Sequence, residues 1–203
     1  YVAEQAERVG IRVYIGPFYR SGRWFTPDGK QVLYQGDEGD GFAGLRRALE
    51  IIDRWDGRAN GRIRGLLSPG QADTCSEALL RETRRLATER RLPVTIHVSQ
   101  SVIEFQEVLR RHGKTPIAWL RDLGFLGPDV ILGHAIIIGG SSWTNYPPGD
   151  IEIMAETGVS VAHSPWVFYR RGIALESFTR YLKAGINISL GTDTCPQSMI
   201  NAM

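Results

Sequence analysis

Short runs of β-branched and apolar residues alternate along this chain with longer stretches that repeat at helical spacing. An alternation of this kind is typical of βα units, whose strands pair in a parallel sheet. The runs contain few polar residues, as expected for strands that helices cover on both faces. The pattern predicts an α/β fold with strands near residues 11–16, 63–68, 93–98, 129–138, 158–163 and 186–191, and helices near residues 2–9, 41–56, 74–91, 101–112, 115–123, 150–157 and 172–184.

Two long connections interrupt the alternation. Residues 21–41 are rich in glycine, aspartate and aromatic residues and are too long for a simple turn, so they form either a functional loop or a mobile insertion. Residues 139–149 form a second elaborated loop. Both connections leave the C-terminal ends of predicted strands, which is where α/β barrels carry their active sites.

Polar side chains mark the ends of four predicted strands. His97, His134 and His163 each lie near the end of an apolar run, and Asp193 follows the last one in Gly191-Thr192-Asp193-Thr194. A carboxylate at the end of a buried strand is costly unless a positive charge meets it, and a metal ion would supply that charge. Imidazole and carboxylate together suit zinc or iron. The sequence therefore predicts a metal site at the strand ends.

Each of these residues also has a structural interpretation. His97 and His134 could be hydrogen-bonded core histidines, and Asp193 could cap a following helix. His163, in His-Ser-Pro, fits substrate contact and plain packing equally well. Cys195 could be read as a nucleophile, but no histidine neighbours it in the sequence and that reading leaves Asp193 unexplained.

Composition excludes several classes of protein. A chain of 203 residues is long enough for one sizeable core. The formal net charge of +2 gives no basis for nucleic-acid binding, and no apolar run reaches the length of a membrane span. The two cysteines, Cys75 and Cys195, lack CxxC spacing and fit a reducing compartment. We therefore expect a cytoplasmic protein that acts on a small molecule, without nucleic-acid or membrane partners.

The ends of the chain suggest a piece of a larger domain. Tyr1 falls inside a predicted helix, and Met203 falls where another helix should begin. Six strands are also fewer than the eight of a closed barrel. We expect residues 1–203 to be a partial barrel domain truncated at both ends. Its open strand edges could be covered by a second copy of the chain, as a homo-oligomer.

An ordered set of short motifs carries a resemblance to a known family. The chain resembles the amidohydrolase superfamily, in particular its branch of cytosine, guanine and S-adenosylhomocysteine deaminases and triazine chlorohydrolases. Each motif is loose, but their order along nearly the whole chain is fairly specific. The matching pieces are Thr74-Cys75-Ser76, Ile96-His97-Val98-Ser99, His112 through Gly127, Gly133-His134-Ala135, Ala162-His163-Ser164-Pro165, Gly191-Thr192-Asp193-Thr194 and Ser198 through Met203.

The resemblance implies a (β/α)8 TIM-type barrel, incomplete here, with about six βα units that correspond to the third to the eighth. It implies one divalent metal, with zinc favoured over iron. His97 would be the ligand of the fifth strand and Asp193 that of the eighth. Asp193 would also take a proton from the metal-bound water, and His134 would be either a further ligand or the group that polarises the substrate. Substrate contacts are expected from Gln100, His163 and Trp166.

Two departures from the family pattern qualify this expectation. The His-x-His pair of the first strand is absent from these 203 residues, so we expect the chain alone to hold metal weakly. Gln100 stands three residues after His97, where many deaminases of this branch carry a glutamate that shuttles a proton. A carboxamide cannot donate and accept a proton in turn, which favours a substrate with a better leaving group, such as a halide.

The function predicted from these residues is that of a metal-dependent amidohydrolase or aminohydrolase. It would attack a C–N or C–halogen bond of a nitrogen heterocycle through a metal-activated water. The alternative is a catalytically silent, barrel-derived ligand-binding protein, with Gln100 marking the lost proton transfer. A third interpretation, a barrel lyase or isomerase without a metal, would use the strand-end histidines and aspartate for acid–base work alone.

Overall fold

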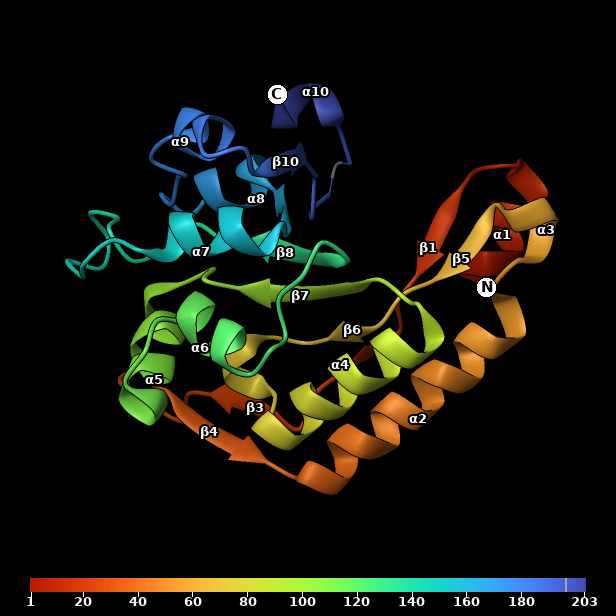
Figure 1. The fold of residues 1–203 in the computed structure, drawn as a ribbon, viewed down its shortest axis with the longest axis horizontal. Coiled ribbons are helices and arrows are strands. Elements are labelled where there is room, and N and C mark those ends of the chain that lie inside the picture. The colour runs from red at the N-terminus through yellow and green to blue at the C-terminus, as the bar shows by residue number, and fades with distance from the viewer. Residues whose placement is uncertain (196) are drawn as a thin grey trace. The chain divides into compact units, whose positions relative to one another are not determined.

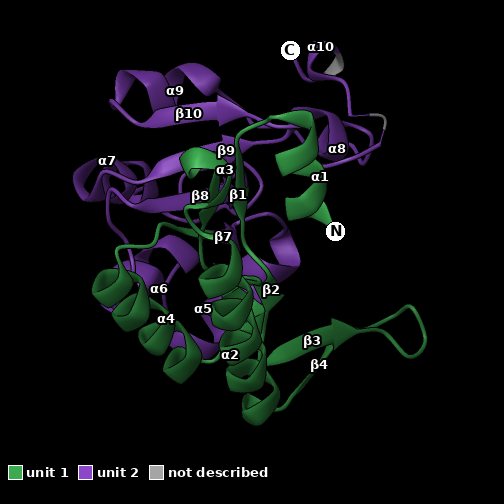
Figure 2. Cartoon of the chain, turned by 90° about the vertical axis from the view of Figure 1, so that its right-hand side faces the viewer, with its two compact units in different colours: residues 1–95 green, residues 96–203 purple. Residues whose placement is uncertain are grey.

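The computed structural model describes residues 1–195 and 197–203 and divides the chain into two compact units, residues 1–95 and residues 96–203 (Figures 1 and 2). We call these unit 1 and unit 2. The predicted alternation of strands and helices is confirmed, since each of the six predicted strand regions contains a strand. None of the helices in the described part of the chain is long and apolar enough to cross a bilayer.

Unit 1 pairs its strands in three small sheets. β1 is parallel to β5, β2 is parallel to β6, and β3 and β4 form an antiparallel hairpin. In Figure 1 these elements run from red to yellow. The elements of unit 1 are α1 (Val2–Val9), β1 (Val13–Ile15), β2 (Phe18–Tyr19), β3 (Gly22–Phe25), β4 (Leu33–Gly36), α2 (Glu38–Trp55), α3 (Arg58–Gly61), β5 (Ile63–Gly65), β6 (Ser68–Pro69), the 3-10 turn η1 (Ala72–Thr74) and α4 (Glu77–Arg90).

The hairpin is the main feature that the sequence did not predict. It occupies much of residues 21–41, which were expected to form a loop or a mobile insertion. Trp24 pairs with Tyr34 and Phe25 with Leu33, but Trp24, Phe25 and Leu33 remain partly exposed to solvent. The hairpin buries little apolar surface. Its residues therefore show neither the apolar run nor the alternation by which strands are recognised in a sequence.

The strands of unit 2 form one sheet of order β10-β9-β8-β7, in which β9 is parallel to both of its neighbours. β7 begins in unit 1 and ends in unit 2. Figure 1 shows this sheet with α7, α8 and α9 nearby. The elements are β7 (Val94–Val98), α5 (Val102–His112), α6 (Pro116–Asp122), β8 (Val130–His134), α7 (Asp150–Thr157), β9 (Ser160–His163), α8 (Pro165–Tyr169), α9 (Phe178–Lys183), β10 (Asn187–Leu190) and α10 (Met199–Ala202).

Local signals explain where these elements begin and end. Side-chain oxygens of Ser101 and Thr115 accept backbone N–H groups at the start of α5 and α6. Gly158 ends α7 in the left-handed conformation that the glycine before the predicted strand indicated. The strand predicted over 129–138 stops at His134, and the helix predicted over 172–184 covers only α9.

Burial also differs from the expectation. In β7, β8 and β9 buried residues alternate with half-buried ones, and β10 alternates exposed with half-buried residues. β10 is the edge strand of the sheet in the described chain, so it has a paired neighbour on one side only. The strands are therefore not covered equally on both faces.

Candidate active site at the strand ends

His97 and His134 lie side by side on neighbouring strands of unit 2. His97 is the next-to-last residue of β7 and is half-buried, whereas His134 ends β8 and is buried. Their ring centroids are 5.3 Å apart and the ring planes are tilted by 31°. Their proximity follows from the pairing of β7 with β8.

Asp193 approaches the same place from beyond β10. The N–H of Gly191 donates to the carbonyl of His163 at 2.8 Å, which extends the pairing of β10 with β9 past Leu190. The Oδ2 atom of Asp193 then lies 3.9 Å from Nε2 of His134. The Asp193 side chain is 51% exposed, so it is not the buried strand-end carboxylate that was expected. It does not cap a helix either, because α10 begins only at Met199.

The backbone is strained at these strand ends. Four residues that are not glycine have left-handed backbone angles there, with φ of 54° at Ser99, 78° at His134, 46° at Ala135 and 44° at Asp193. Such conformations cost about 1–3 kcal/mol each and persist only where the surroundings impose them. At Ala135 the surroundings include the buried hydroxyl of Tyr181, which donates to the Ala135 carbonyl at 2.5 Å. Strain of this kind concentrates at functional sites.

His134 is held in its neutral form. Burial, together with smaller electrostatic effects of His97, His163 and Arg171, lowers its pKa to about 3. The ring of Phe168 packs edge-on against the imidazole at 4.6 Å between centroids. Nδ1 of His134 is buried and has no hydrogen-bond partner among the described residues. A neutral imidazole can ligate a metal or hydrogen-bond a substrate, which a protonated one cannot do in the same way.

Glu104 is a residue of this site that the sequence analysis missed. Its buried carboxylate accepts the backbone N–H of Ser99 through Oε1 and that of Gln100 through Oε2, both at 2.9 Å. Ser101 in turn accepts the N–H of Glu104 at 3.1 Å. Glu104 therefore fixes the turn that follows β7. The spacing Ser101-x-x-Glu104 is that of a capping box and would have signalled this role.

His163, which ends β9 beside β8, and Trp166 of α8 share a further feature. Both line a hollow of about 360 Å³, together with Tyr169, Ile173 and Leu175. Burial lowers the pKa of His163. Nδ1 of His163 and Nε1 of Trp166 are buried without a hydrogen-bond partner in the described part of the chain. Gln100 is half-buried, with its backbone held by Glu104.

The side chains at the strand ends are of the chemical types that bind a divalent metal. His97 and His134 offer imidazole nitrogens and Asp193 offers carboxylate oxygens, which are ligands that zinc accepts. The unpartnered Nδ1 of His134 shows that this buried ring is not satisfied by the described residues alone. Among those residues, however, no three histidine, cysteine, aspartate or glutamate side chains lie close enough together to hold a metal ion.

Comparison with solved structures identifies the fold. An adenosine deaminase from Xanthomonas campestris with bound zinc aligns with a TM-score of 0.75 and 24% identity, over 96% of this chain and 40% of that one. Atrazine chlorohydrolase from Arthrobacter aurescens, as a mutant complexed with zinc and atraton, aligns with a TM-score of 0.75 and 23% identity, over 93% of this chain and 39% of that one. The chain thus has the mixed α/β fold of these TIM-barrel-type enzymes.

Sequence comparison gives the family. A 5'-deoxyadenosine deaminase from Methanothermobacter thermautotrophicus is 38% identical over 193 residues, which are 95% of this chain and 40% of that protein. The chain therefore spans about two fifths of the length of this relative. The model of the amidohydrolase family matches residues 2–203. The chain belongs to the amidohydrolase family.

Proposed function

We propose that this chain carries part of the active site of a metal-dependent hydrolase that acts on a nitrogen heterocycle. The observation that supports the proposal most is that His134, at the end of β8, lies beside both His97 of β7 and Asp193, which follows β10. His134 and Asp193 come from distant parts of the sequence and both have left-handed backbone angles, which a purely structural role would not require.

The bond that is cleaved is a C–N or a C–halogen bond, and relatives favour the first. The relative from Methanothermobacter thermautotrophicus is named as a deaminase of 5'-deoxyadenosine, at 38% identity. The chlorohydrolase supports only the shared fold at 23% identity. We therefore propose hydrolytic deamination of a purine-type ring as the first activity to test, and release of a halide from a heterocycle as the second.

The residues divide the work as follows. His97 and Asp193 would contribute ligands to one divalent metal, zinc before iron, and His134 would either join them or polarise the substrate. A metal bound there supplies positive charge that makes a water molecule more acidic. Asp193, whose carboxylate is half exposed, would accept the proton released by that water. His134, neutral because of its lowered pKa, would hydrogen-bond the ring of the substrate.

Substrate contacts are proposed for Gln100, His163 and Trp166. His163 and Trp166 line the 360 Å³ hollow and carry unpartnered buried nitrogen atoms, which suit an aromatic ligand with polar edges. We further propose that residues 1–203 supply the third to the eighth βα units of one barrel domain. Metal ligands beyond those described would then come from the first strand of that domain.

A catalytically silent binding protein is the second candidate. Gln100 in place of an acid, and the lack of a three-residue metal group among the described residues, both favour it. The decisive experiment is elemental analysis of the protein that carries this chain, purified without added chelator or metal, beside its Asp193→Ala variant. About one zinc or iron per chain, lost in the variant, supports the hydrolase and justifies a screen of heterocyclic amines and halides. A folded protein that takes up no metal when offered it contradicts the hydrolase.

A further inference from the structure

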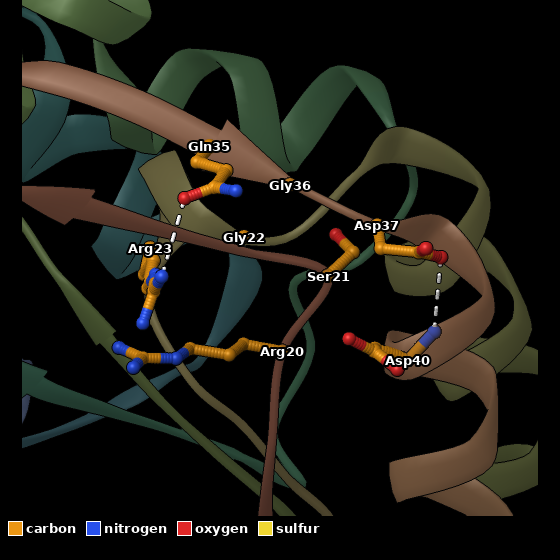
Figure 3. A pocket seen from close by; sticks show the side chains of 8 residues that line it. All are labelled: Arg20, Ser21, Gly22, Arg23, Gln35, Gly36, Asp37 and Asp40. Carbon is orange, nitrogen blue, oxygen red and sulfur yellow. Dashed lines mark hydrogen bonds between the residues drawn. The ribbon is translucent and has the colours of Figure 1, made fainter.

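Unit 1 contains a hollow of about 500 Å³ that the proposed hydrolase site does not use. It lies where the hairpin β3–β4 meets the start of α2, and all of its lining residues come from residues 20–40. Its volume is within the range of small-molecule sites. Figure 3 shows the lining residues, which are Arg20, Ser21, Gly22, Arg23, Gln35, Gly36, Asp37 and Asp40.

The backbone at the base of the hollow is fixed by close contacts. The N–H of Asp37 donates to the carbonyl of Ser21 at 2.8 Å. The hydroxyl of Ser21, which is buried, accepts the N–H of Ser76 at 2.7 Å. A Cβ atom added to Gly36 would lie 2.8 Å from the Ser21 carbonyl oxygen, so only glycine allows this approach. The side chains that line the hollow therefore project from a rigid frame.

The charges around the hollow are segregated. Figure 3 shows the guanidinium groups of Arg20 and Arg23 on one side and the carboxylates of Asp37 and Asp40 on the other. Arg20 is held over the ring of Phe18, 5.6 Å from its centroid. Arg23 donates to Oε1 of Gln35 at 3.2 Å. Asp37 uses only Oδ1 to accept the N–H groups of Gly39 and Asp40.

These opposite charges do not neutralise one another. None of the four charged residues forms an ion pair with another residue that the structure describes. Elsewhere in the chain, arginines beside carboxylates do pair, as Arg85 does with Glu82 and with Glu89 at 2.7 Å. Two cationic and two anionic residues, all exposed to solvent, thus line one hollow without an ion-pair partner among the described residues.

We propose that this hollow binds a small zwitterion, a molecule with a carboxylate at one end and an ammonium group at the other. A guanidinium group matches a carboxylate with two parallel hydrogen bonds, and an aspartate accepts hydrogen bonds from an ammonium group. A simple anion would meet the aspartates, and a simple cation would meet the arginines, so each would gain less than a molecule that carries both charges. None of the residues that line the hollow has a role in the proposed hydrolase reaction.

A series of ω-amino acids of increasing length tests which separation of carboxylate and ammonium group matches the arginine and aspartate sides of the hollow. Glycine, β-alanine, 4-aminobutyrate, 5-aminovalerate and 6-aminohexanoate would be titrated into the protein by calorimetry, with butyrate and butylamine as singly charged probes. We expect one chain length to bind best, at least tenfold tighter than butyrate and butylamine. Arg23→Gln and Asp40→Asn should each lower the affinity for the best-binding amino acid at least fivefold. Arg12→Gln and Asp28→Asn, which change exposed residues outside the hollow, should not.

Three outcomes overturn the proposal. The first is that no member of the series binds at 20 mM, and the second is that butyrate binds as well as the best amino acid, which indicates an anion site. The third is that binding is unchanged in Arg23→Gln and Asp40→Asn while circular dichroism shows both variants folded. Because these measurements need no metal and no turnover, their failure is distinguishable from failure of the proposed hydrolase.

Discussion

Nε2 of His134 lies 3.9 Å from Oδ2 of Asp193, although one residue ends β8 and the other follows β10. The two groups differ in environment, since His134 is buried and neutral and half of the Asp193 side chain is exposed. A neutral imidazole beside a solvent-accessible carboxylate is suited to polarising a substrate while the carboxylate exchanges a proton with water.

Replacing Asp193 with asparagine should abolish turnover while leaving the fold intact. The amide keeps the shape of the side chain but cannot accept a proton at neutral pH. Because proton transfer contributes about 10²–10⁴-fold, we expect kcat/KM to fall at least about 100-fold. Asp28→Asn makes the same chemical change on an exposed loop of unit 1 and should retain activity. Turnover within threefold of the parent in Asp193→Asn would contradict the assigned role.

The lowered pKa of His134 predicts how stability depends on pH. The unfolded chain takes up a proton on this residue below its ordinary pKa of 6.5, whereas the folded chain does so only near 3. The contribution of a neutral His134 is therefore fully present above pH 6.5 and is lost as the pH falls toward 3. Between pH 7 and pH 5 the loss is up to about 2 kcal/mol.

Urea unfolding of the metal-free protein tests this value. His134→Gln cannot take up a proton in this range, so its free energy of unfolding should fall less than that of the parent between pH 7 and pH 5. If the two proteins show the same pH dependence, the His134 imidazole is not protected from protonation in the folded state.

Glu104 should matter for stability because its buried carboxylate accepts two backbone N–H groups. In Glu104→Gln one carboxylate oxygen becomes an NH2 group, which cannot accept the N–H of Ser99 or of Gln100. Leaving a buried N–H without an acceptor costs about 1–3 kcal/mol, and we expect the free energy of unfolding to fall by that amount. Glu152→Gln, on an exposed position of α7, should change it by less than about 0.5 kcal/mol.

The parts of the fold that could be predicted are those that bury a regular apolar pattern. β7 and β8 alternate buried residues with half-buried ones, and both strands lie within the regions predicted for them, 93–98 and 129–138. The hairpin β3–β4 was missed because Trp24, Phe25 and Leu33 remain exposed. Its strands are stabilised by pairing with each other, which leaves no periodic trace in a single sequence.

The candidate site, too, was predictable from the sequence only in part. The residue types at the strand ends were visible in the sequence, but the exposure of Asp193 was not, because it depends on β10 lying at the edge of the sheet. The left-handed conformation of His134 also depends on tertiary contacts such as the hydrogen bond from Tyr181 to the Ala135 carbonyl. Long-range contacts of this kind decide geometry that local preference cannot.

Gln100 allows a direct test of which bond the proposed hydrolase would cleave. In Gln100→Glu a group that can carry a proton replaces a carboxamide two residues after β7, on a backbone that Glu104 already fixes. Because an amine must be protonated to leave and a halide need not be, the change should raise kcat/KM for an amino-substituted heterocycle at least tenfold relative to the halogenated analogue. Gln106→Glu, the same substitution at an exposed position of α5, should leave that ratio unchanged. A ratio that stays constant in Gln100→Glu would mean that position 100 takes no part in proton transfer, and that the carboxamide serves substrate binding alone.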